Sequence, residues 1–220
     1  MTLCIVVPTM SRKINGLAYF KQTLFLNRPI FNTYKTCIYI NETDLAILQS
    51  DLEGLTIIPR VNHDEKLTMF TKDTYPYWRS HLCVDFIYCM TKAVELYPEC
   101  TAFMWLEDDV LLHPGFSWKN NEQFVWTANG HGATCIITEK NYLLSTILPS
   151  ITQHYLEDMP LDFMYRYWVQ QTRLDKTVAF HIGVESSQIN CIRPQNDWKA
   201  YTNAKSQHED ELQRAQHSMK

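Results

Sequence analysis

Glycine is scarce in this chain, with six among 220 residues. Loops that hold phosphate groups on backbone amides need glycines at fixed spacings, as in G-x-x-x-x-G-K-[ST] and G-x-G-x-x-G. Neither pattern occurs, and the nearest match, Gly130-His131-Gly132, precedes an apolar run instead of following one. We therefore expect neither a P-loop nucleoside triphosphatase nor a Rossmann dehydrogenase.

An excess of basic residues and long apolar runs are also missing. The 20 basic residues are outnumbered by 24 acidic ones, which argues against a nucleic-acid partner. No stretch approaches the roughly 18 consecutive apolar residues of a membrane-spanning helix. The first apolar run is not preceded by the basic segment of a signal peptide. We therefore expect a cytoplasmic protein with no membrane segment.

Paired cysteines are not indicated either. The seven cysteines are odd in number, form no C-x-x-C pair and mostly lie in apolar stretches, so we expect buried free thiols. With 45% hydrophobic residues, a chain of this length can bury about 70% of its unfolded surface in one core. We expect one domain over residues 1–198 and a polar helix or tail over 199–220.

Short apolar runs alternate with longer helical patterns, which predicts an α/β domain with a mostly parallel central sheet flanked by helices. The expected strands are 3–7, 36–40, 55–58, 101–106, 133–138 and 178–182. The expected helices are 15–27, 43–54, 80–96, 141–156 and one after Pro160. The polar stretch 60–77 is long enough to be a functional loop.

Three acids follow one of these strands directly. Glu107-Asp108-Asp109 lies between the apolar runs 102–106 and 110–112, where an open α/β sheet presents its ligand crevice. Three carboxylates in a partly buried turn need compensation, and a divalent ion with oxygen ligands supplies it. An acidic helix N-terminus is the alternative. A bound ion would also neutralise a diphosphate, which points to a sugar-nucleotide or nucleotidyl transferase.

Six short motifs occur in a fixed order along the chain. They are Val7-Pro8-Thr9-Met10-Ser11-Arg12, Glu42-Thr43-Asp44, Trp78-Arg79 with Asp85-Phe86, Leu106-Glu107-Asp108-Asp109-Val110, Pro160-Leu161-Asp162-Phe163, and His181-Ile182-Gly183 with Ser186-Ser187. Together they resemble the β-1,4-N-acetylglucosaminyltransferase IV family, whose members have a GT-A fold. Glu185 stands where that family has a histidine, which leaves the transferred sugar open.

The resemblance implies an inverting glycosyltransferase that moves a sugar from a UDP-sugar to a hydroxyl of a glycan or glycoprotein. Asp109, the last acid of the turn, is the first candidate metal ligand, and the resemblance makes His181 the second. An imidazole ligand favours Mn²⁺ over Mg²⁺. Asp162 is the candidate catalytic base. The candidate nucleotide-binding residues are Pro8, Thr9, Arg12, Glu42, Asp44, Arg79, Asp85, Glu107 and Asp108.

Each of these roles has a plainer alternative. His181 could be a hydrogen-bonded core residue, Arg12 a solvated side chain, and Asp162 an acid at a helix start, with Glu157 and Asp158 as rival bases. Glu42 and Asp44 could cap a helix, and Arg79 could pair with Asp85. Two other functions also stay open: a nucleotidyltransferase that releases pyrophosphate, and a glycan-binding module with a structural Ca²⁺.

Overall fold

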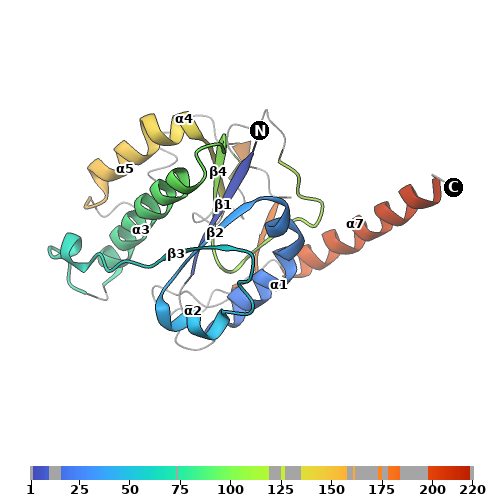
Figure 1. Ribbon diagram of the computed structural model, residues 1–220, viewed down its shortest axis with the longest axis horizontal. Helices are drawn as coiled ribbons and strands as arrows, with labels where there is room; N and C mark the ends of the chain where they lie inside the picture. The colour runs from blue at the N-terminus through green and yellow to red at the C-terminus, as the bar shows by residue number, and fades with distance from the viewer. Residues whose placement is uncertain are drawn as a thin grey trace.

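The computed structural model describes residues 2–9, 16–72, 74–118, 125–126, 135–157, 161, 173–174, 178–183 and 198–218. They form an α/β fold with a mostly parallel central sheet flanked by helices, as the sequence predicts (Figure 1). In this part of the chain no helix is long and apolar enough to cross a bilayer.

The central sheet, as described, has seven strands in the order β3-β2-β1-β4-β7-β6-β8. Their bounds are β1 Leu3–Pro8, β2 Lys35–Ile40, β3 Thr56–Pro59, β4 Ala102–Leu106, β6 Val125–Trp126, β7 Cys135–Glu139 and β8 Arg173–Leu174. Neighbours from β3 to β4 are parallel, and β7 runs antiparallel to β4 and to β6. A second sheet pairs β5 (Val110–Leu112) with β9 (Ala179–His181) in antiparallel fashion.

The order of the strands reverses between β1 and β4. The chain adds β2 and β3 on one side of β1 and then crosses to its other side with β4. In open α/β sheets, ligands bind outside the carboxyl ends of the strands at such a reversal. The residues that continue from these two carboxyl ends are Thr9 and the acidic turn Glu107-Asp108-Asp109.

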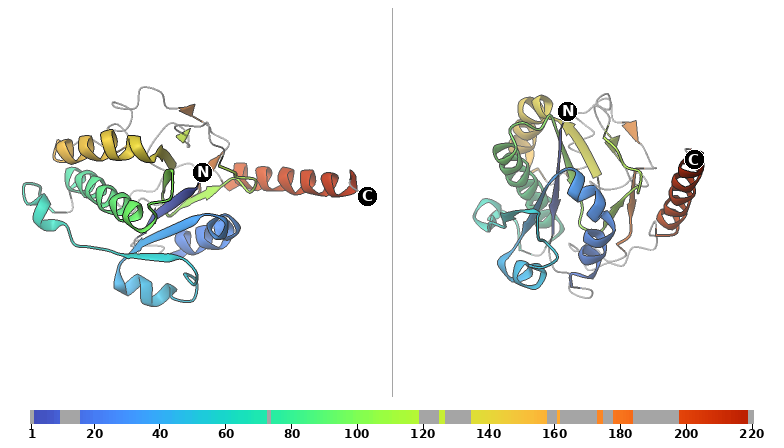
Figure 2. Two further views of the ribbon diagram at one scale, coloured as in Figure 1. Left: turned by 45° about the horizontal axis from the view of Figure 1, so that its top comes forward. Right: turned by 45° about the vertical axis from the view of Figure 1, so that its right-hand side comes forward.

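Helices cover both faces of the sheet. Helices α1 (Ala18–Thr33) and α2 (Glu42–Leu48) lie on one face, and α3 (Tyr75–Leu96) lies on the other with α5 (Leu148–His154) (Figure 2). Strand β1 alternates between the two cores: Ile5 and Val7 pack with α1, and Val6 packs with α3. Such strands are buried on both faces, which explains their continuous apolar character.

Four more helical segments are described. A 3-10 turn, η1 (Asp64–Leu67), lies within the polar stretch before α3. Helix α4 (Lys140–Tyr142) and the π-turn η2 (Leu143–Ile147) lead into α5. The C-terminal helix α7 (Trp198–Ser218) packs Tyr201 against Phe180 of β9 and then extends away from the sheet (Figures 1 and 2).

Several element boundaries differ from the prediction. Helix α3 begins at Tyr75 instead of 80, because the first turn of a helix accommodates Pro76. Helix α1 continues to Thr33 instead of ending at 27. The sequence pattern did not separate β5, β6 and β8 as strands, since they have only two or three residues each. The helix expected after Pro160 lies outside the described residues, apart from Leu161.

The prediction of free cysteines is confirmed for six of the seven. All six are buried and form no disulfide: Cys4, Cys37, Cys83, Cys89, Cys100 and Cys135. Cys191 lies outside the described residues. Burial raises the pKa of the Cys100 thiol to about 11. It thus behaves as a small apolar side chain instead of a reactive thiolate.

Candidate functional site

The acidic turn joins the central sheet to the small sheet. Strand β4 ends at Leu106, and the Val110 N–H donates to the Glu107 carbonyl (3.2 Å), which closes the turn. Strand β5 then pairs with β9, and Val110 lies opposite His181. The Ile182 N–H donates to the Asp109 carbonyl (2.9 Å). This pairing brings together two residues that are 72 positions apart in the sequence, Asp109 and His181.

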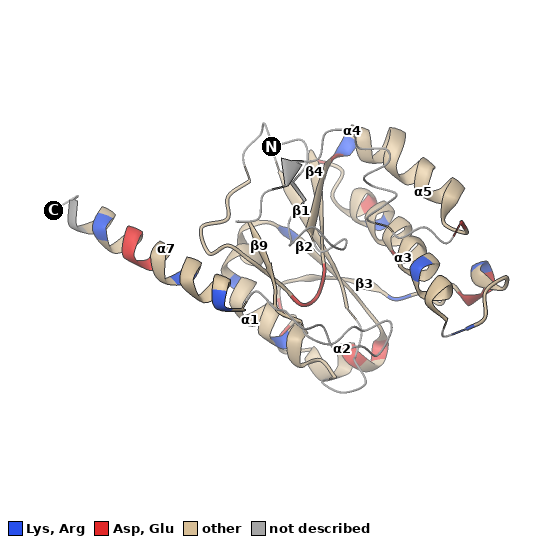
Figure 3. Cartoon of the chain, turned by 180° about the vertical axis from the view of Figure 1, so that it is seen from behind, with Lys and Arg blue, Asp and Glu red and all other residues tan. Residues whose placement is uncertain are grey.

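Three side chains converge at this turn. Ligand atoms of Glu107, Asp109 and His181 all lie within 4.8 Å of one another. His181 Nε2 lies 3.2 Å from Asp109 Oδ2, and the exposed fractions of these two residues are only 8% and 2%. Figure 3 shows the turn in red at the end of β4. The structure therefore contains a possible metal site made of two carboxylates and one imidazole.

The donor set fits a divalent ion. Ligand atoms about 2.1 Å from an ion lie roughly 3–4.2 Å from one another, close to the spacing of this cluster. Carboxylate oxygens and imidazole nitrogens are both common ligands of divalent ions. Three protein ligands also leave coordination positions for water or for the oxygens of a phosphate.

The backbone at Gly183 forms one wall of this site. A Cβ atom at position 183 would lie 1.8 Å from Asp109 Oδ2 and 2.6 Å from its Cγ. The Asp109 carboxylate therefore occupies space that only a glycine leaves open. This close approach limits the space available to the Asp109 carboxylate on the side of Gly183, which follows His181 by two residues.

The middle acid of the turn is held by the neighbouring strand. Thr9, just after β1, donates a hydrogen bond from Oγ1 to Asp108 Oδ2 (2.8 Å). Both residues are buried, and the Thr9 N–H also donates to the Tyr39 carbonyl of β2 (2.9 Å). The structure thus brings Thr9 and Asp108 together where the strand order reverses. Pro8, the last residue of β1, lies beside them in the sequence.

A buried asparagine of α1 contacts the other edge of β5. The side chain of Asn27 donates from Nδ2 to the Val110 carbonyl (2.9 Å), and the Leu112 N–H donates to Asn27 Oδ1 (2.9 Å). Asn27 was not among the residues predicted from the sequence. A signal was present, since Asn27 is a polar residue at helical spacing from the apolar Phe20, Leu24 and Phe31.

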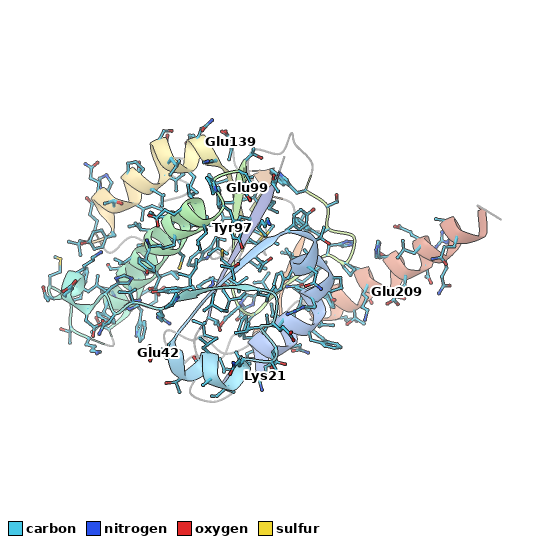
Figure 4. The ribbon with its side chains drawn as sticks, viewed as in Figure 1. Lys21, Glu42, Tyr97, Glu99, Glu139 and Glu209 are labelled. Atoms are coloured by element: carbon cyan, nitrogen blue, oxygen red, sulfur yellow. The ribbon has the colours of Figure 1, made fainter. Side chains whose placement is uncertain are left out.

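The candidates Glu42 and Asp44 lie at the start of α2. Asn41 caps this helix, because its Oδ1 accepts from the Asp44 N–H (2.7 Å). Its Nδ2 donates to Asp44 Oδ2 (2.9 Å), and Asp44 is buried. Glu42 is exposed (Figure 4). Both acids follow the carboxyl end of β2, on the same edge of the sheet as the acidic turn.

Asp85 lies in a separate buried network beyond β2. Its carboxylate accepts from the Tyr39 hydroxyl (3.0 Å) and from Arg60 Nη2 (2.8 Å). His81 Nδ1 lies 3.2 Å from Oδ2, and His63 Nε2 lies 3.8 Å from Oδ1. The arginine paired with Asp85 is therefore Arg60, which the sequence analysis did not select. The guanidinium of Arg79 lies 3.8 Å from the centre of the Tyr75 ring.

Burial shifts two ionisable groups of this network, which we call the Asp85 network (Tyr39, Arg60, His63, His81 and Asp85). Burial, followed by the charge of Asp85, raises the pKa of the Tyr39 hydroxyl well above its usual range. Burial lowers the pKa of His63, and the charges of Lys66, His81 and Arg60 lower it further, while Asp85 opposes them. Both side chains are therefore held in their neutral forms near neutral pH.

Two candidates cannot be placed relative to the site. Arg12, a candidate for nucleotide binding, and Asp162, the candidate base, lie outside the described residues. The same holds for Asp158, one of the rival bases. Their roles remain predictions from the motifs.

Comparisons with known proteins give similarity of fold only. No family model matches the chain, and no curated protein sequence matches it. One similar solved structure is a glycosyltransferase involved in the glycosylation of the major capsid of PBCV-1 (10% identity, 80% of this chain and 82% of that one, TM-score 0.47).

Two further solved structures are similar at the same level. One is 4-diphosphocytidyl-2C-methyl-D-erythritol synthase from Anaerococcus prevotii (10% identity, 94% and 98% covered, TM-score 0.45). The other is the PaToxG glycosyltransferase (12% identity, 76% and 67% covered, TM-score 0.44). At these identities no residue's role transfers from any of them.

Proposed function

We propose that this chain is a metal-dependent glycosyltransferase that moves a sugar from a UDP-sugar to a hydroxyl group of a glycan. The proposal rests on the convergence of Glu107, Asp109 and His181 beside the carboxyl ends of β1 and β4. This is the edge where open α/β sheets bind nucleotides. The six ordered motifs support sugar transfer as the reaction.

The described residues would divide the work of donor binding. Asp109 and His181, with Glu107, would hold Mn²⁺ directly or through water. The ion, when bound, would stabilise negative charge on the departing diphosphate. Thr9 would keep Asp108 in place beside the ribose or sugar, since its hydroxyl already donates to that carboxylate. Glu42 and Asp44 would accept hydrogen bonds from the nucleoside at the end of β2.

The transfer itself would form one bond and break another. The acceptor oxygen would bond to the anomeric carbon from the face opposite the diphosphate, and the bond from that carbon to the phosphate oxygen would break. The electron pair of the broken bond would leave with UDP, and the hydroxyl proton would pass to Asp162. The configuration at the anomeric carbon would invert.

A thermal-shift panel of UDP-sugars, with and without Mn²⁺, tests donor binding. A ligand of the folded state must raise the midpoint of unfolding, and we expect a larger rise with UDP-sugar and Mn²⁺ together than with either alone. Asp162→Asn should keep this shift and lose transfer. No shift with any nucleotide would reject the proposal and favour a glycan-binding module.

The released product separates sugar transfer from nucleotidyl transfer. The convergence of acids at this edge suits either reaction, because each needs charge stabilisation on a departing phosphate. A glycosyltransferase releases UDP from a UDP-sugar, whereas a nucleotidyltransferase releases pyrophosphate from a nucleoside triphosphate. Pyrophosphate release from UTP with a sugar phosphate, without UDP release from UDP-sugars, would replace the proposed reaction.

A further inference from the structure

Strand β5 carries the backbone that follows the acidic turn, and among the described residues only one of its edges pairs with a strand. The Asp109 carbonyl and the His113 N–H bond to the chain around β9. The Val110 carbonyl and the Leu112 N–H point the opposite way. In a two-stranded sheet these groups would face water or a further strand. Here Val110 and Leu112 are buried, at 1% exposure each, so their backbone groups need partners inside the protein.

The side chain of Asn27 supplies both partners. Its amide has one donor and one acceptor group, like a peptide group of a neighbouring strand. Nδ2 meets the Val110 carbonyl and Oδ1 meets the Leu112 N–H, each at 2.9 Å. Asn27 itself is fully buried on α1. A single side chain thus replaces a strand on the second edge of β5.

We infer that Asn27 is a positioning residue for the candidate metal site. Asp109 immediately precedes the bonded Val110, and the opposite edge of the same short strand pairs with β9, which ends in His181. If β5 slid along its own axis or moved away from Asn27, Asp109 would change its position relative to Glu107 and His181. This inference rests on the proposed function, because it assumes that the three ligands bind a metal ion.

The test measures Mn²⁺ affinity directly, by titration calorimetry, well below the unfolding midpoint of every variant. Asn27→Leu keeps the volume and removes both amide groups. Changes in residues that orient metal ligands commonly weaken metal binding by about 10- to 100-fold, and we expect a loss in that range. Asn27→Ser, which keeps one hydroxyl, should lose less and remains informative where the leucine variant fails to fold.

Two variants of the same helix serve as controls. Thr23 lies one turn earlier, and its buried Oγ1 has no hydrogen-bond partner among the described residues, so Thr23→Val removes a polar group without disturbing β5. Ile30→Ala lowers stability by opening a cavity in the same core. Both should bind Mn²⁺ within about twofold of the unaltered protein, since neither removes a bond to β5.

The possible results separate the two claims. Unaltered protein that binds no Mn²⁺ would overturn the proposed metal site and this inference with it. Unaltered protein that binds Mn²⁺, together with folded Asn27 variants of equal affinity, would overturn the inference alone. An equal loss of affinity in Ile30→Ala would also overturn it, because general loosening of the helix would then explain the effect.

Discussion

Two buried aspartates near the same edge of the sheet have different neighbours among the described residues. Around Asp85 the hydrogen-bond donors converge: Tyr39 and Arg60 donate to its carboxylate, and His81 lies within reach. Around Asp109, possible metal-ligand atoms of Glu107 and His181 lie within 4.8 Å of an oxygen of its carboxylate. A buried carboxylate surrounded by donors is stabilised by its own protein, whereas converging carboxylates and an imidazole form the surroundings that a cation needs.

Buried acids with a structural role differ from ligand-binding ones in the atoms that face their carboxylates. A motif reports that an aspartate occurs at a position, and it does not report which atoms face the carboxylate. The Asp85 network contains the cation Arg60 at 2.8 Å, which disfavours a metal ion there by repulsion. The site at Asp109 gathers residues from two sheets. The two aspartates should therefore respond differently to substitution.

The largest effect is expected from Asp109→Ala. Removing a direct ligand should abolish the stabilisation of the departing phosphate, which is worth several kcal/mol, so Mn²⁺-dependent transfer should fall by about a thousandfold or more. The assay is release of UDP from a UDP-sugar at saturating Mn²⁺. Asp51→Ala, which removes an exposed acid after α2, controls for the change in net charge. Unchanged Mn²⁺-stimulated transfer in Asp109→Ala would reject the metal assignment.

The Asp85 network should respond through stability instead. Asp85→Asn leaves Arg60 without its buried partner, and such a loss commonly costs about 3 kcal/mol. Urea unfolding measures this change, and the affinity for Mn²⁺ should stay within about twofold of the unaltered value. Replacing both partners, as Arg60→Met with Asp85→Leu, should recover part of the stability.

The opposite result would restore the nucleotide-binding role that the motifs predict for Asp85. Unaltered stability of Asp85→Asn, combined with a clear loss of UDP affinity, would place the carboxylate in contact with the nucleotide. The comparison between the two aspartates would then fail, because both would act on ligands.

A smaller effect is expected where Asp109 packs against the backbone. Gly183→Ala would place a methyl group on the Asp109 carboxylate and turn it away from His181. The affinity for Mn²⁺ should fall by about tenfold, with the fold retained. Calorimetric titration measures the affinity, and circular dichroism monitors the fold. Equal affinity in this variant would show that Asp109 reaches the ion from more than one direction.

The sequence predicted the α/β layers and the acidic turn because both depend on local patterns. Continuous apolar runs such as Leu3-Cys4-Ile5-Val6-Val7 predict strands buried on both faces. The three acids after β4 stand out against their apolar flanks.

The contacts within the site were beyond reach of local patterns. The approach of His181 to Asp109 depends on the pairing of β5 with β9, which are short strands far apart in the sequence. The clearance at Gly183 depends on the same pairing, and the two bonds of Asn27 depend on the packing of α1 against the other edge of β5. The alternative pairing of Arg79 with Asp85 on the same helix is not the one in the structure, where Arg60, which follows β3, pairs with Asp85.

The smallest effect is expected from pH, through His63 in the Asp85 network. Burial lowers the pKa of His63 in the folded protein, with Lys66, His81 and Arg60 acting in the same direction. Well above pH 6.5 the imidazole is neutral in both states, so its contribution to stability is fully present. As the pH falls below 6.5, the unfolded chain takes up a proton before the folded chain does, and stability decreases. Less than one proton is involved, so the slope from this group stays below about 1.4 kcal/mol per pH unit.

Urea unfolding between pH 7.5 and 5 measures this loss of stability, with His63→Leu as the comparison. The variant should lose less stability than the unaltered protein over that range. If the unaltered protein and His63→Leu have parallel profiles of stability against pH, His63 takes up its proton equally in the folded and unfolded states. The Asp85 network would then accommodate a charged imidazole.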